Sequence, residues 1–280
     1  MKNITTLVAP VLKWAGGKRQ LLKTIVPLLP QNISAYCEPF VGGGALLFNL
    51  LPKIAYVNDI APELINVYHT IKTDVESLIR VLKTFKNTRE KFYAIRNWDR
   101  SNDPFPYSEL SNINKAARTL YLNKTCYNGL YRVNSKGQFN SPFGNYARPN
   151  IVNADGLRAV SGYFNSAKVS LTSVDYADVL GTLPKNCFVY LDPPYHPISK
   201  TSSFVSYTGN GFSRDEQIRL RENCEDLTLR GIKFMLSQSF SEFTMGLYSH
   251  YNITTVEAKR AINSKGNRRG KIPELIIRNY

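Results

Sequence analysis

The chain has 280 residues, enough for one large domain or two modest ones with a sizeable buried core. Hydrophobic residues make up 43% and charged residues 20% of it, which excludes wholesale disorder. The formal net charge of +15 indicates a partner with dense negative charge, and nucleic acid is the commonest such partner. A basic surface that serves only solubility is the alternative.

The positive charge is concentrated in two segments. Residues 61–170 carry 16 basic and 8 acidic side chains, and residues 256–280 carry 7 basic and 2 acidic ones. A surface made basic only for solubility has no reason to be distributed in this way. We therefore predict that both segments face nucleic acid. Arg268 and Arg269, in a basic stretch broken by glycines, are candidates for contacts with phosphates.

Several classes of protein are disfavoured by residue usage. The four cysteines form no C-x-x-C pair and the three histidines are scattered, so the sequence predicts no zinc site, disulfide framework or Ser-His-Asp triad. No window approaches the ~20 apolar residues of a membrane span, and the first ten residues contain no cleavage signal. We expect a monomer without a metal or a membrane anchor, in a reducing cytoplasm.

The first third of the chain has the order of a βαβ unit. An apolar-periodic helix is expected at 20–29, a strand at 34–40, a helix at 45–51, a strand at 54–59 and a helix at 62–82. Three consecutive glycines end the first strand. A strand, a glycine turn, a helix and a second strand in this order indicate a parallel sheet.

The middle of the chain interrupts this pattern. Residues 87–166 show little β periodicity: helices are expected at 90–97 and 114–123, followed by a β-hairpin that pairs 131–133 with 138–140. Further strands are expected at 169–174, 187–191, 233–236, 253–258 and 275–278, and a capping box at 213–216 opens a helix that Gly231 closes. The sequence thus predicts an α/β fold with a seven-stranded, mostly parallel sheet, whose catalytic parts are 1–60 and 166–280, with an inserted recognition domain at 61–165.

Ligands of open α/β sheets bind outside the carboxyl ends of the strands, and two of these ends carry informative residues early in the chain. The glycines of the turn 41–44 would let a ligand approach the backbone, although a tight turn is an equal alternative, and their spacing disfavours a dinucleotide. Asp59 ends the next strand, where a carboxylate either binds ribose hydroxyls or caps the following helix.

A third strand end carries the sequence Asp192-Pro193-Pro194-Tyr195. The two prolines lack backbone donors and force an extended, rigid turn. The Asp192 carboxylate and the following carbonyl groups would therefore form a cradle of hydrogen-bond acceptors, which suits an exocyclic amino group. Tyr195 offers a flat face on which a base can stack.

Together these motifs resemble the amino-directed DNA adenine methyltransferases that use S-adenosylmethionine, and within them the Dam and DpnII-type GATC methylases of the D12 class. The resemblance covers nearly the whole chain, including 13–18, 38–44, 58–59, 128–132, 139–144, 192–195 and 206–210. It implies a Rossmann-like methyltransferase sheet with an inserted helical and β-hairpin DNA-recognition domain. It also implies a bacterial or phage-encoded enzyme, either partnered with a nuclease in a restriction-modification system or acting alone.

The resemblance assigns roles to individual positions. Trp14 and Lys18 would lie at the methionine side of the cofactor, Asp59 at its ribose and Asp175 at its adenine. The residues expected at the cofactor are Trp14, Ala15, Gly16, Lys18, Glu38, Pro39, Phe40, Gly42, Gly44, Asp59, Ile60, Asp175, Tyr176 and Asp192. The residues expected to contact double-stranded DNA are Lys13, Tyr127, Asn128, Leu130, Arg132, Asn134, Pro142, Tyr146, Arg268 and Arg269. Asn145 departs from a position that is often basic in this family.

The catalytic residues implied are Asp192, Pro193, Pro194 and Tyr195. An aromatic amino nitrogen is a poor nucleophile, because its lone pair is delocalised into the ring. Acceptors at Asp192 and the Pro193 carbonyl would favour a more tetrahedral nitrogen and stabilise its developing positive charge. The base must leave the duplex and stack on Tyr195, and residues 196–212 are long enough to form a lid.

Three other functions remain to be compared with this one. Methylation of an amino group on RNA or on a protein glutamine also uses Pro-Pro-Tyr turns, but typically with Asn in place of Asp192 and without the hairpin. A DNA-binding protein with an inactive site is disfavoured because each expected site position holds a competent residue. A nicotinamide oxidoreductase is disfavoured by the glycine spacing.

Overall fold

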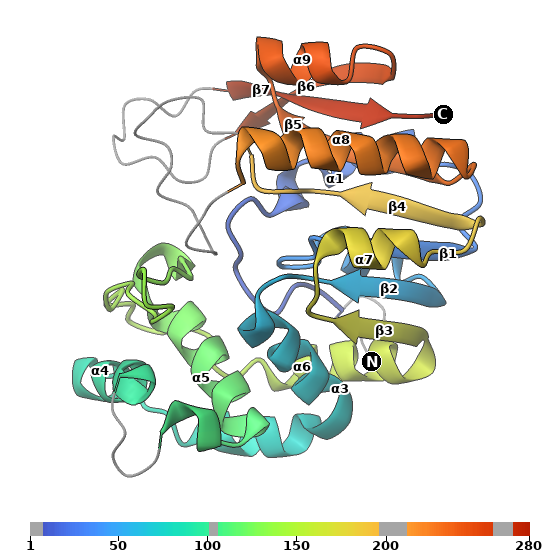
Figure 1. Cartoon of the computed structure of the whole chain (residues 1–280). Helices are drawn as coiled ribbons and strands as arrows, with labels where there is room; N and C mark the ends of the chain where they lie inside the picture. Colours follow the sequence, from blue (N-terminus) through green and yellow to red (C-terminus); the bar gives the residue numbers. More distant parts are fainter. Residues whose placement is uncertain (1–7, 101–105, 196–211, 260–270) are drawn as a thin grey trace.

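The computed structural model describes residues 8–100, 106–195, 212–259 and 271–280. Their strands form one seven-stranded sheet in the order β3-β2-β1-β4-β5-β7-β6 (Figure 1). The strands are β1 (Ala35–Glu38), β2 (Ile54–Asn58), β3 (Lys168–Thr172), β4 (Cys187–Leu191), β5 (Lys233–Ser239), β6 (Asn252–Lys259) and β7 (Lys271–Arg278). All seven strands predicted from the sequence are confirmed, with ends that differ by a few residues.

The sheet is mostly parallel, as predicted. Strands β1 to β5 pair in parallel, whereas β7 runs antiparallel to both β5 and β6. All residues of the central strands β1 and β4 are buried, because helical segments cover both faces of the sheet. The carboxyl ends of β1, β2, β3 and β4 therefore meet at one edge, which is where the predicted motifs lie.

The long predicted helices are confirmed and several shorter elements differ. The α-helices are α1 (Leu22–Ile25), α2 (Leu47–Leu50), α3 (Pro62–Lys83), α4 (Arg89–Arg96), α5 (Asn112–Thr125), α6 (Ala154–Ser166), α7 (Tyr176–Gly181), α8 (Arg214–Leu229) and α9 (Glu242–Leu247). The helix expected at 20–29 is instead divided into short turns, since Pro27 opens a separate 3-10 turn after α1. No described helix is long and apolar enough to cross a membrane.

Helix α6 was not predicted, because its two glycines weaken the helical pattern. Tertiary packing compensates for them. Phe164 of α6 lies 5.8 Å from Phe48 of α2 and 5.9 Å from Tyr68 of α3, measured between ring centroids. These buried rings join the three helices to the core beside β2 and β3. Although α3 and α6 fall within the segment predicted to be inserted, both also contact β3.

The predicted β-hairpin is present outside the sheet. Val133 pairs with Phe139 in antiparallel fashion, and the amide of Asn140 donates to the carbonyl of Arg132 at 2.9 Å. The Asn134 side chain accepts hydrogen bonds from the amides of Lys136 and Gln138, which closes the turn. In Figure 1, α4 and α5, which precede the hairpin, lie to one side of the sheet. The division into a catalytic and a recognition domain remains a prediction.

A buried ion pair attaches the hairpin to α4 and α5. The Arg118 guanidinium lies 2.6 Å from the Asp99 carboxylate, and only 1% of Arg118 is exposed. Asp99 also accepts a 2.8 Å hydrogen bond from the amide of Phe139, and Arg118 donates to the carbonyl of Ile95 at 3.0 Å. The position of the hairpin therefore depends on a charge pair that is shielded from water.

We predict that Asp99→Ala destabilises the protein by about 3–5 kcal/mol, because it leaves the buried Arg118 guanidinium without its counter-charge. The matched control is Asp155→Ala, which removes an exposed acid whose ion pair with Arg158 lies at the surface, and which should cost less than about 1 kcal/mol. Urea unfolding of the parent and both variants measures the difference. A loss for Asp99→Ala as small as that of the control would contradict the assignment.

Candidate active site

The turn after β1 is built around Asp59. One oxygen of its carboxylate accepts a hydrogen bond from the amide of Gly42 at 2.9 Å, and the other accepts from Ala61 at 3.0 Å. Gly42 has a φ of +48°, and a Cβ atom there would lie 2.8 Å from the Trp14 ring, so this position requires glycine. Asp59 thus links the glycine turn to the start of α3, and burial raises the pKa of its carboxyl to about 6.

Glu38 lies at the end of β1, 3% exposed, among the other acidic groups of this edge. The hydroxyl of Tyr36 donates a 2.8 Å hydrogen bond to its carboxyl group. Burial raises the pKa of Glu38 to about 8, with smaller contributions from Asp192 and Asp59 in the same direction. Burial therefore favours the protonated, uncharged form of Glu38.

Asn58 fastens the carboxyl ends of three strands together. Its amide group donates to the carbonyls of Pro39 and Val174, at 3.2 and 3.0 Å. Its carbonyl oxygen accepts from the amide of Val174 at 3.0 Å and from the hydroxyl of Thr172 at 2.8 Å. The sequence motif Asn58-Asp59 indicated only the carboxylate, because two of the three partners of Asn58, Thr172 and Val174, lie more than a hundred residues away along the chain.

The loop after β3 forms the far side of this edge. Asp175 caps α7 through the amide of Ala177, and its carboxylate forms an ion pair with Arg219 of α8 at 2.7 Å. This guanidinium lowers the pKa of Asp175. The Phe40 and Tyr176 rings pack with centroids 5.0 Å apart, and Ile60 is 51% exposed. Arg219 was not identified from the sequence, because a basic residue on an amphipathic helix carries no local signal.

Asp192 meets Lys18 where β4 ends. The Lys18 ammonium lies 2.8 Å from the Asp192 carboxylate and 4.4 Å from the centroid of the Tyr195 ring. Burial raises the pKa of Asp192 to about 6, although Lys18 opposes the shift. The Tyr195 hydroxyl donates to Glu274 of β7 at 2.9 Å. The structure therefore brings together Lys18, which the resemblance assigned to the cofactor, and Asp192 and Tyr195, which it assigned to the target base, and adds Glu274.

A pair of buried glutamines supports the turn that carries the two prolines. Gln217 of α8 donates to the carbonyl of Pro194 at 3.4 Å, and its own side-chain oxygen accepts from Gln238 of β5 at 2.7 Å. Pro193 is buried and Pro194 is exposed. The turn is thus fixed both by its own prolines and by the neighbouring strand and helix.

The N-terminal motif and the hairpin lie against each other. Asn123 of α5 accepts from the amide of Lys13 at 2.9 Å and donates to its carbonyl at 2.7 Å. The rings of Trp14 and Tyr131 stack with centroids 5.1 Å apart. These contacts connect the segment predicted to bind the cofactor with the segment predicted to read DNA.

The residues predicted to contact DNA, as far as they are described, lie on or beside the hairpin. Tyr127 is 58% exposed, and Asn128 and Pro142 are exposed as well. The Arg132 guanidinium donates to Asn140 across the hairpin at 2.7 Å, which fixes its direction. Half-buried residues of this set are Leu130, Asn134 and Tyr146, and the exposed Lys13 extends over the Tyr146 ring.

Asn145 has a φ of +51°, a conformation that asparagine adopts more readily than lysine or arginine. Arg268, Arg269 and all but the last residue of the proposed lid at 196–212 lie outside the described residues.

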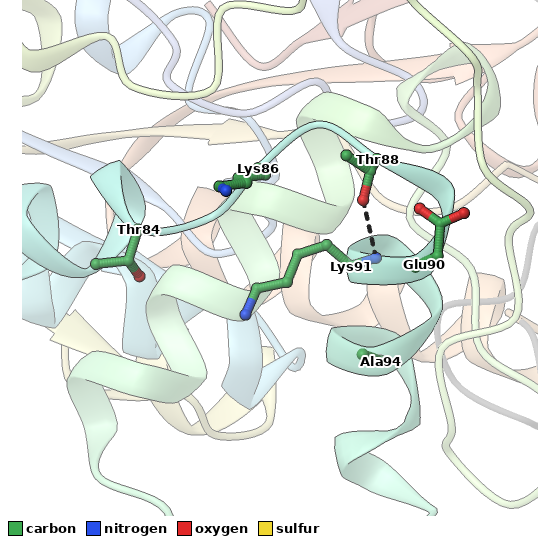
Figure 2. A pocket seen from close by; sticks show the side chains of 6 residues that line it. All are labelled: Thr84, Lys86, Thr88, Glu90, Lys91 and Ala94. Carbon is green, nitrogen blue, oxygen red and sulfur yellow. Dashed lines mark hydrogen bonds between the residues drawn. The ribbon is translucent and has the colours of Figure 1, made fainter.

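A pocket of about 410 Å³ lies where the segment after α3 meets the first turns of α4. Figure 2 shows the side chains that line it. It is lined by Thr84, Lys86, Thr88, Glu90, Lys91 and Ala94. The Thr88 side chain accepts from the amide of Lys91 and caps α4. None of the motif residues lines this pocket, so we place the candidate active site at the carboxyl edge of the sheet instead.

Comparison with known proteins bears on this site. The family described as D12 class N6 adenine-specific DNA methyltransferase matches residues 14–262. The chain belongs to this family. It is 42% identical to the Type II methyltransferase M1.LlaDCHI of Lactococcus lactis subsp. cremoris, over 97% of this chain and 95% of the relative. It is 42% identical to the Type II methyltransferase M.MjaIII of Methanocaldococcus jannaschii, over 98% of this chain and 99% of the relative.

A further relative is the DNA adenine methylase of Escherichia coli K12, 33% identical over 95% of this chain and 93% of that protein. The predicted enzyme class, adenine-specific DNA methyltransferase, and the resemblance to Dam-type enzymes are thus confirmed. The α/β methyltransferase sheet agrees with this membership. Within the described residues, no group of three or more His, Cys, Asp or Glu side chains is arranged to hold a metal ion.

The buried Glu38 predicts an unusual dependence of stability on pH. Its pKa is about 8 in the folded protein, against an ordinary value of 4.5. Its contribution to stability is therefore complete below pH 4.5 and is lost as the pH rises through 8. Between about pH 5 and 8 the unfolding free energy should fall by about 1.4 kcal/mol per pH unit relative to Glu38→Gln, which keeps an acceptor for Tyr36 but does not titrate. Denaturant unfolding of both proteins across this range measures the slope; parallel curves would contradict the prediction.

Proposed function

We propose that this enzyme transfers a methyl group from S-adenosylmethionine to the N6 amino group of adenine in duplex DNA, within the sequence GATC, after the base has flipped out of the helix. The observation that carries the proposal is the convergence of Asp192 and Tyr195 with the glycine turn at one edge of the sheet. A hydrogen-bond acceptor, a ring for stacking and a turn that a ligand can approach are the parts that this reaction requires.

The residues around the glycine turn fit S-adenosylmethionine, which supplies an electrophilic methyl group on a sulfonium centre when bound. Gly42 places backbone against the Trp14 ring where a side chain would clash. The carboxylate of Asp59 accepts two backbone hydrogen bonds and has lone pairs left for ribose hydroxyls. Ile60 and Val174, 51% and 42% exposed and next in sequence to Asp59 and Asp175, offer apolar surface for a purine ring.

Asp192 is the acceptor for the target amino group. A carboxylate can accept about four hydrogen bonds, so Asp192 can hold the Lys18 ammonium and an amino hydrogen at the same time. Its negative charge stabilises the positive charge that develops on the attacking nitrogen. Tyr195 stacks on the flipped base, and the stacking energy offsets part of the few kcal/mol needed to unstack it.

The hairpin is the proposed reader of GATC. The exposed Tyr127 and the oriented guanidinium of Arg132 can reach base edges, because the hairpin lies outside the sheet. The excess of basic residues in 61–170 supplies the attraction to phosphates. The GATC sequence itself is supported by the resemblance of 128–132 and 139–144 to Dam-type enzymes. A monomeric state and a cytoplasmic location are part of the same proposal.

Substitution of Asp192 tests the chemistry. Asp192→Ala should slow methyl transfer by at least about 30-fold, the effect of losing roughly 2–3 kcal/mol of preorganised stabilisation. Transfer by the parent should decline below about pH 6, where Asp192 becomes protonated, whereas Asp192→Asn keeps an acceptor and should lack this decline. Single-turnover transfer of labelled methyl at saturating cofactor measures both, with melting curves as a control. Turnover of Asp192→Ala within tenfold of the parent would refute the role.

Substitution of Arg132 tests the reading of bases. An arginine bidentate to guanine contributes about 1–3 kcal/mol of discrimination, whereas a phosphate contact weakens binding to all sequences alike. Arg132→Ala should therefore raise methylation of single-base variants of GATC relative to GATC itself. Lys136→Ala, at the exposed tip of the same hairpin, is the matched control and should leave this ratio unchanged. Methylation rates on each variant at two salt concentrations separate the two roles. An equal slowing of every sequence by Arg132→Ala would exclude base reading.

A further inference from the structure

Glu274 is an acidic residue of the candidate site that no sequence motif indicated. It lies on β7, which runs antiparallel between β5 and β6, and it pairs with Ser239 and Val256. Because β7 runs opposite to β5, residue 274 near its start lies at the same edge as the carboxyl ends of the parallel strands. Its side chain is 16% exposed and so is largely shielded from water.

The contacts of Glu274 converge on the turn that carries Asp192. One oxygen of its carboxylate accepts the 2.9 Å hydrogen bond from the Tyr195 hydroxyl. The same oxygen lies 3.9 Å from the Lys18 ammonium, which is 2.8 Å from Asp192. Lys18 also lies over the Tyr195 ring. The Glu274 carboxylate thus holds the hydroxyl end of Tyr195. It also lies near Lys18, the lysine that pairs with Asp192.

We propose that Glu274 is the positioning residue for Tyr195, and that it fixes the plane of the ring on which the target adenine stacks. The two prolines fix the backbone at the near end of Tyr195, but they leave rotation about its side-chain bonds open. The hydrogen bond to Glu274 at the hydroxyl end removes that freedom. Because Lys18 occupies one face of the ring, the tether leaves the base a single face and a single orientation relative to Asp192.

This inference rests on the proposed function, and a double-mutant cycle separates the two. The proteins are the parent, Glu274→Ala, Tyr195→Phe, the double variant and Glu274→Gln. If Glu274 acts through the hydroxyl, either single change should lower kcat at least tenfold, and the double variant should be no slower than the slower single. The KM for DNA should stay within threefold, because neither residue belongs to the reading hairpin. Glu274→Gln retains an acceptor for the hydroxyl and should recover most of the loss.

A second measurement is independent of the reaction. The melting temperatures of the four proteins of the cycle should also be non-additive, since each single change breaks the same hydrogen bond. Glu222→Ala, which removes an exposed acid of α8, is the matched control for loss of one negative charge. This control should change neither kcat nor the coupling between Glu274 and Tyr195 that the cycle measures.

The outcomes separate the two hypotheses. Kinetic effects that multiply, additive melting temperatures or a failure of Glu274→Gln to recover activity would each overturn the role of Glu274 while leaving the proposed function intact. A parent protein that transfers no methyl group to DNA adenine would overturn the proposed function. In that case the coupling in melting temperature still decides whether Glu274 holds Tyr195.

Discussion

The candidate site depends on the 2.8 Å ion pair between Lys18 and Asp192. Lys18 belongs to the N-terminal glycine-rich motif and Asp192 to the end of β4, so this pair joins two parts of the chain that are more than 170 residues apart. Only 5% of the Lys18 side chain is exposed. A buried ammonium needs counter-charges, and the chain supplies them at Asp192 and, farther away, at Glu274.

The same constraint accounts for the other acidic groups of this edge. Glu38 lies in the same buried layer, where a third full negative charge would be costly, and burial raises its pKa to about 8. Asp59 is satisfied by two backbone amides, and Asp175 by Arg219. The edge thus holds several carboxyl groups with different partners. Among the described residues, the cation that pairs with Asp192, Lys18, is also the one that lies over the Tyr195 ring.

The sequence was sufficient for the seven strands of the sheet and for most residues of the candidate site, whose roles stay predictions. The strands could be predicted because each is a short apolar run bounded by turns, and the motifs could be found because glycine and proline act locally. Arg219, Glu274 and the Gln217–Gln238 pair could not be found in this way. Each is an ordinary polar residue of a helix or strand, and its importance comes only from the element that packs beside it.

Residues 87–166 show the same difference between what the sequence predicts and what packing adds. The turn residues of the hairpin could be predicted directly from the sequence. The ion pair of Asp99 with Arg118, which holds the hairpin in place, could not, because neither residue lies in a recognisable sequence motif. Helix α6 was missed because its glycines weaken the local pattern, and aromatic packing against α2 and α3 outweighs that weakness.

The stack of Trp14 on Tyr131 has a thermodynamic consequence. The two rings belong to the segment beside the glycine turn and to the hairpin, so neither segment can shift without disturbing the other. Binding at two linked sites is reciprocal. If a ligand at the first site changes the affinity of the second site by some factor, a ligand at the second site changes the affinity of the first by the same factor. Under the proposed function, a base pair that displaces the hairpin would therefore be sensed at the glycine turn, and discrimination between sequences would be expressed as occupancy of that turn, without any contact between the turn and the mismatch.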